Sequence, residues 1–122
     1  MNGRHKGRSG WKRVWNALFY SLDGFAAAFK HEDAFRFEVI LALILIPLAL
    51  HMHVSGIGRA LMVASVLLVL VIELLNTAIE AATDRISLDD HVLAKRAKDM
   101  GSAAVMLSLI DVPVVWFLVA FG

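Results

Sequence analysis

Residues 71–86 read VIELLNTAIEAATDRI, an apolar run that polar side chains interrupt at regular intervals. The polar positions follow the spacing i, i+3, i+4, i+7 and i+11, and they are Glu73, Asn76, Thr77, Glu80 and Asp84. In a helix that turns by about 100° per residue, these positions share one face. Two glutamates therefore point the same way along an otherwise apolar helix.

The segment that carries this polar face, residues 60–82, is long enough to cross a membrane. A charged side chain at that depth is costly, so it should face a polar cavity or a partner instead of lipid. Hydrogen bonding between packed helices is the alternative role, and for Asn76 the two interpretations are balanced. Glu80 lies one turn from Asp84, whereas Glu73 lies two turns deeper, roughly 10 Å. We therefore expect Glu80 to meet a soluble reagent and Glu73 to act as a general base on a lipid-borne group.

The composition of the whole chain predicts a membrane protein. Hydrophobic residues make up 59% of its 122 residues, above the roughly 45–50% of soluble domains. One membrane domain is expected over residues 1–122, with membrane helices at 39–58, 60–82 and 100–122. Three helices from so short a chain enclose little interior, so we expect the chain to form oligomers.

The first thirty residues are expected to lie outside the lipid core. Residues 1–10 form a basic tail, and apolar side chains recur every three or four positions over residues 11–30. This spacing predicts an amphipathic helix on the membrane surface. A secretory signal peptide is the rival interpretation, but polar residues interrupt its apolar core at helical intervals. Lys and Arg gather before residue 14 and in residues 83–99, so the positive-inside rule places both regions and the N-terminus in the cytoplasm.

Several classes of function are excluded by what the chain lacks. A net charge of +1 provides no broad positive surface for nucleic acid. The absence of cysteine excludes thiolate catalysis. No G-x-x-x-x-G-K-[ST] run is present, so a nucleotide would have to be held by carboxylates, metal and basic side chains instead of a P-loop.

Residues 91–102 read HVLAKRAKDMGS and place Lys95, Lys98, Asp99 and Ser102 on one helical face. Basic residues there could bind phosphates, although membrane anchoring by the positive-inside rule explains them equally well. Glu32 lies between the surface helix and the first membrane helix. It could hold Mg²⁺ together with Glu80 and nucleotide phosphates, or it could belong to a solvated elbow.

Two other polar residues suggest less specific roles. By itself, His91 is more typical of a protein surface than of a ligand site. Asp111 lies in the third apolar segment, roughly opposite the face of Lys98 and Ser102 by the same rotation of 100° per residue. We expect Asp111 to pack against another helix or protomer and to lie outside the site.

Three runs of sequence resemble the signature of the prokaryotic diacylglycerol kinases: ELLNTAIE at 73–80, DRI at 84–86 and RAKDMGSAAV at 96–105. The resemblance extends over residues 11–118. It implies an all-α integral membrane protein of the bacterial inner membrane, a homotrimer with three transmembrane helices and one surface helix per subunit. It also implies active sites formed between subunits and the phosphorylation of diacylglycerol to phosphatidic acid, with ATP as donor and Mg²⁺ as cofactor.

The same resemblance implies roles for individual residues. Glu73 corresponds to the base that takes the proton of the lipid hydroxyl, while Glu32 and Glu80 correspond to residues that hold the metal and ATP. The further nucleotide contacts that the resemblance implies are Arg13, Tyr20, Asp89, Asp90, His91, Lys98 and Asp99. The lipid contacts that it implies are Arg13, Ser21, Glu73, Asn76 and Ser102.

The chain departs from the family pattern in two places. Leu22-Asp23-Gly24 stands where many members carry Trp-Lys-Gly, so any contact from a lysine at position 23 does not carry over. Asp111 is also unusual in the third membrane helix.

Three alternatives to a diacylglycerol kinase remain open from the sequence. An undecaprenol kinase of the same fold is the nearest, although the RAKDMGSAA run favours diacylglycerol. A proton-relaying or channel-forming oligomer would also use buried glutamates, but it has no need of Lys98 and Asp99 beside them. A purely structural subunit would not react with ATP at all.

Overall fold

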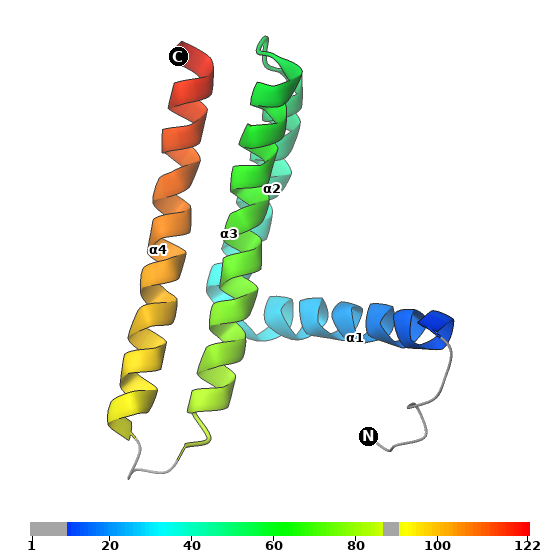
Figure 1. The fold of residues 1–122 in the computed structure, drawn as a ribbon, viewed down its shortest axis with the longest axis vertical. Coiled ribbons are helices and arrows are strands. Elements are labelled where there is room, and N and C mark those ends of the chain that lie inside the picture. The colour runs from blue at the N-terminus through cyan, green and yellow to red at the C-terminus, as the bar shows by residue number, and fades with distance from the viewer. Residues whose placement is uncertain (1–9, 87–90) are drawn as a thin grey trace.

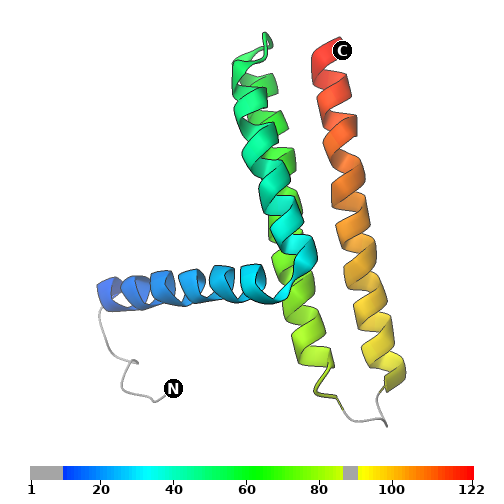
Figure 2. The same cartoon turned by 180° about the vertical axis from the view of Figure 1, so that it is seen from behind.

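The computed structural model describes residues 10–86 and 91–122, and within these ranges every regular secondary-structure element is a helix. The four helices are α1 (Gly10–His31), α2 (Asp33–His51), α3 (Gly56–Thr83) and α4 (His91–Phe121). Figures 1 and 2 show α2, α3 and α4 running side by side, whereas α1 extends away from them to one side. Both α3 and α4 continue past the level at which α1 leaves the bundle.

The sharp turn between α1 and α2 is made at Glu32. Its backbone is extended, at φ −119° and ψ 111°, which interrupts the helical path. Arg36 from the first turn of α2 reaches back and donates hydrogen bonds to the Phe29 and Lys30 carbonyls, at 2.7 and 3.0 Å. These carbonyls belong to the last turn of α1, where intrahelical donors are missing. Arg36 therefore caps α1 and fixes the elbow that carries Glu32.

The turn between α2 and α3 divides the apolar run expected at 39–58. α2 ends at His51, and α3 begins at Gly56 because the Ser55 hydroxyl accepts a hydrogen bond from the Gly58 amide at 3.0 Å. Arg59 donates a further bond to the Met52 carbonyl at 2.9 Å. The polar atoms of this turn are thus satisfied by local partners.

α3 is the central helix of the bundle, and α2 and α4 pack on it. Its buried apolar residues are Met62, Val66 and Val69, while α2 contributes Phe35, Ala42 and Ala49. The indole Nε1 of Trp116 on α4 donates to the Met62 carbonyl and the Ser65 hydroxyl, both at 3.2 Å. Small residues bring α3 and α4 together, because a Cβ added at Gly58 would lie 2.7 Å from the Val119 side chain.

Three of the helices, α2, α3 and α4, are long and apolar enough to cross a membrane. Much of their apolar surface is uncovered, and Leu43, Leu107 and Phe117 are all more than 60% exposed. An exposed apolar surface of this extent is typical of contact with lipid or with other protein chains.

Candidate functional site

Four carboxylates gather where α1, α2 and α3 meet, and we call Glu32, Glu38, Glu73 and Glu80 the carboxylate cluster. Glu73 is only 5% exposed, and its carboxylate interacts electrostatically with those of Glu80 and Glu32. The Glu38 carboxylate, on the first turns of α2, interacts with that of Glu73 in the same way. The ion pairs found in the described residues, Arg36–Asp33, Lys95–Asp99 and Lys98–Asp84, include none of the four. Like charges brought close together favour the binding of a cation or a proton.

Glu38 is the residue that reasoning from the sequence missed. It is 7% exposed, and its Oε1 atom is buried without a hydrogen-bond partner. The spacing of residues in the sequence could have revealed Glu38. The four buried residues of α2 follow helical spacing, and they are Phe35, Glu38, Ala42 and Ala49. An acid on the buried face of an apolar helix is costly and therefore points to a functional role.

The buried polar atoms without partners are confined to this region. In residues 10–86 and 91–122 they are Glu38 Oε1, Asn76 Oδ1 and Thr77 Oγ1. Asn76 is 7% exposed, and its Nδ2 donates a long hydrogen bond of 3.4 Å to Glu80 Oε2. Most buried polar groups in folded proteins have a partner, so this concentration of unpaired atoms marks a place where a ligand can bind.

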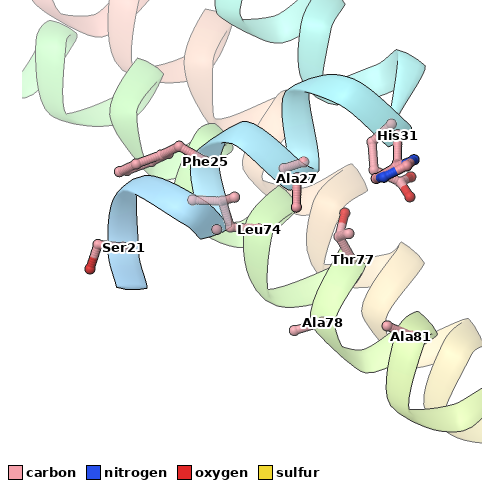
Figure 3. A pocket seen from close by; sticks show the side chains of 11 residues that line it. Ser21, Phe25, Ala27, His31, Leu74, Thr77, Ala78 and Ala81 are labelled. Atoms are coloured by element: carbon pink, nitrogen blue, oxygen red, sulfur yellow. The ribbon is translucent and has the colours of Figure 1, made fainter. Parts of the chain in front are cut away.

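A cavity of about 620 Å³ opens beside the cluster, between α1 and the second half of α3 (Figure 3). Most of its lining is apolar and includes Phe25 from α1 and Leu74 from α3. The polar side chains along it are Ser21, His31, Glu32 and Thr77. An apolar cavity with a polar edge and a nearby carboxylate suits an apolar molecule that carries a hydroxyl group.

A second hollow, of about 290 Å³, lies between the end of α3 and the start of α4. It gathers His91, Lys98 and Asp99, together with Asp84 and Lys95. Lys98 Nζ donates to Asp84 Oδ1 at 2.9 Å, and Lys95 Nζ donates to Asp99 Oδ2 at 2.7 Å. The Lys98 ammonium also interacts electrostatically with Glu80. Lys98 thus lies between this hollow and the carboxylate cluster.

The other residues expected at the site are more dispersed. Arg13 and Tyr20 lie exposed on α1 and line neither cavity, and Ser102 is exposed on α4. Asp89 and Asp90 fall outside the described residues. Asp111 is half-buried and lines a separate hollow with Leu68 and Ser108, away from the carboxylate cluster.

The protein side chains by themselves supply only part of the ligands that a metal ion needs. Among the described residues, no group of three His, Cys, Asp or Glu side chains is arranged to hold an ion. Glu32 and Glu80 supply carboxylate oxygens and take part in none of the ion pairs found in the described residues, although Lys98 interacts electrostatically with Glu80. This donor set fits Mg²⁺, which is commonly held by one or two carboxylates plus substrate phosphates and water.

Comparison with known proteins identifies the family of this chain. Residues 19–120 match the family model described as prokaryotic diacylglycerol kinase. A protein named diacylglycerol kinase from Pseudomonas aeruginosa is 53% identical over 117 residues, covering 96% of this chain and 95% of that protein. Its namesake from Haemophilus influenzae is 48% identical over 108 residues, covering 88% and 92%. The Escherichia coli protein of the same name is 44% identical over 108 residues, 88% of each chain. The chain therefore belongs to the prokaryotic diacylglycerol kinase family.

Proposed function

We propose that this protein transfers the γ-phosphoryl group of ATP to the free hydroxyl of diacylglycerol and releases phosphatidic acid and ADP. Membership of the family and the names of its relatives support the reaction class. The observation that carries the proposal is Glu73, a buried carboxylate that belongs to none of the ion pairs of the described residues and precedes Leu74 and Thr77, which line an apolar cavity.

In this proposal Glu73 is the general base. The lipid hydroxyl oxygen attacks the γ-phosphorus, its proton passes to the Glu73 carboxylate, and the bond to the ADP oxygen breaks. Positioning and charge stabilisation supply most of the catalysis of phosphoryl transfer, and one base is enough for the acceptor. Glu38 interacts with Glu73, and we assign it to orienting that carboxylate.

Glu32 and Glu80 hold Mg²⁺ with the ATP phosphates. When bound, the metal ion would neutralise charge on the transferring group. Lys98 exchanges its Asp84 contact for a phosphate oxygen, since its ammonium group interacts electrostatically with Glu80. Six further residues complete the proposed nucleotide contacts: Arg13, Tyr20, Asp89, Asp90, His91 and Asp99.

The lipid lies with its acyl chains along the apolar cavity and its hydroxyl toward Glu73. The residues proposed to contact it are Arg13, Ser21, Asn76 and Ser102, in addition to Glu73. We further propose that the protein is a homotrimer in the bacterial inner membrane, with α1 on the cytoplasmic surface. The exposed apolar faces of α3 and α4 support contact with lipid or with other subunits.

The assay that tests the function supplies the purified protein in detergent or bilayer with ATP, Mg²⁺ and either diacylglycerol or undecaprenol. Formation of labelled phosphatidic acid supports the proposal. Preferential phosphorylation of the polyprenol would make undecaprenol the substrate in place of diacylglycerol. If ATP is consumed with neither lipid, the protein is a proton relay, a channel or a structural subunit. Mixing Glu73→Gln subunits with Glu80→Gln subunits then tests shared sites, because recovery of activity requires residues from two chains.

A further inference from the structure

Gly101 lies on α4 directly opposite Asn76 on α3, and both residues are buried. A Cβ added at Gly101 would overlap the Asn76 Oδ1 atom and would lie 3.2 Å from Asn76 Cγ. Only a residue without a side chain leaves room for the amide in its present position. The place of the Asn76 side chain is thus defined by the backbone of α4.

The Asn76 amide is oriented by both of its neighbours. Its Nδ2 donates to Glu80 Oε2, while its Oδ1 is buried against Gly101 without a hydrogen-bond partner. A flipped amide would turn its oxygen toward the Glu80 carboxylate, where two acceptors would repel each other. The Glu80 carboxylate therefore favours the amide with its donor side toward Glu80, and the absence of a side chain at Gly101 leaves room for the amide in that place.

From these contacts we propose that Gly101 is a positioning residue, which holds the Asn76 amide against Glu80 and so orients the carboxylate that binds Mg²⁺ and nucleotide. This inference rests on the proposed function, because that function gives Glu80 its ligand. Gly101 itself touches neither substrate nor metal. Its action passes through Asn76, in the way that outer ligands orient the inner ligands of a metal site.

Alanine at position 101 should change the site without unfolding the bundle. The added methyl group meets the far end of a flexible side chain and no backbone of α3, so Asn76 can rotate away. Alanine is also the better residue in a helix interior. The structure thus predicts that Gly101→Ala loses metal–nucleotide affinity and keeps its thermal stability.

The experiment compares Gly101→Ala with Gly58→Ala, which also adds a methyl group between α3 and α4 but meets Val119 at the other end of the contact. Equilibrium binding of Mn²⁺–ATP, followed by electron paramagnetic resonance, is measured beside kcat, KM and the melting temperature. We expect Gly101→Ala to weaken Mn²⁺–ATP binding and raise KM for the metal–nucleotide by about tenfold or more. Gly58→Ala should change neither.

A double-mutant cycle separates positioning from general packing. In an Asn76→Ala background, Gly101→Ala should cause no further loss, because the amide through which it acts is gone. Additive losses would overturn the proposal, as would equal effects of Gly101→Ala and Gly58→Ala. Failure of Gly101→Ala alone to fold would also contradict it, since the clash falls on a movable side chain.

The two proposals fail in different ways. A wild-type protein that binds Mn²⁺–ATP but phosphorylates no lipid would overturn the proposed function, and the binding comparison would still decide the role of Gly101. An active wild-type protein with an unchanged Gly101→Ala variant would overturn only the positioning role.

Discussion

The two ends of the contact between α3 and α4 are built differently. At one end, Trp116 Nε1 donates to Met62 and Ser65, and the Ser65 hydroxyl donates to the Met62 carbonyl at 2.7 Å. At the other end, Asn76 leaves its Oδ1 atom buried without a partner, and the carboxylate cluster lies beside it. Both ends bury polar groups between the same two helices, yet only one end satisfies them.

The difference separates packing from function. Satisfied hydrogen bonds inside an apolar bundle hold helices together and specify their register. Unpaired polar atoms cost free energy, and they persist where a ligand completes them. The Trp116 end is therefore interpreted as structural and the carboxylate cluster as the place where chemistry occurs. Substitutions at the two ends should accordingly affect different measurements.

The largest effect is expected from Glu73→Gln at the carboxylate cluster. The amide keeps the size of the side chain but accepts no proton, so kcat should fall by about 10² to 10⁴-fold, the usual contribution of a general base. Binding of ATP should persist, because Lys98 and Glu80 remain. Turnover close to that of the wild type would remove Glu73 from the role of base.

The second effect is expected from Lys98→Met at the edge of the same region. The loss of one charge-assisted phosphate contact should raise KM for ATP by about tenfold. Stability should hardly change, because the ion pair with Asp84 is exposed to solvent. Lys95→Met is the control, since Lys95 pairs with Asp99 in the same hollow. An equal rise in KM for both variants would indicate a general loss of charge instead of a specific contact.

Trp116→Phe should act on stability alone. It removes the indole donor to Met62 and Ser65, which should lower the free energy of unfolding by about 1 kcal/mol. Unfolding in a mixed-detergent titration measures that loss, and the same sample gives the kinase rate. A fall in rate without a loss of stability would show that the Trp116 end is coupled to catalysis.

The smallest effect is expected from Asp33→Asn, at the α1–α2 elbow beside Glu32. The Asp33 side chain is 94% exposed, and its ion pair with Arg36 is a surface contact. Its loss should change the free energy of unfolding by about 0.5 kcal/mol or less, and Arg36 keeps its bonds to the α1 carbonyls. Unchanged kinase kinetics would sharpen the comparison, because an exposed acid one residue from Glu32 would then contribute nothing to catalysis.

The sequence predicted the all-helical class, the three apolar helices and the family, each now confirmed. It also placed Glu73, Asn76 and Glu80 on one face, because helical spacing is a property of a single segment. It did not predict that Glu38 joins them, since Glu38 belongs to another helix and lies at the edge of an apolar run. Nor did it reveal that Lys98 on α4 pairs with Asp84, which follows the end of α3 and lies 14 positions earlier in the chain.

The sequence by itself determined the helices, their apolar character and the polar face of residues 73–84, because these follow from local spacing and composition. The tertiary structure decided what that face meets. Glu38 approaches Glu73 because α2 packs on α3, and Glu32 approaches it through the elbow that Arg36 stabilises. Asn76 has room in its place because Gly101 comes opposite it. Burial and contact between helices depend on how separate segments pack, so no single segment specifies them.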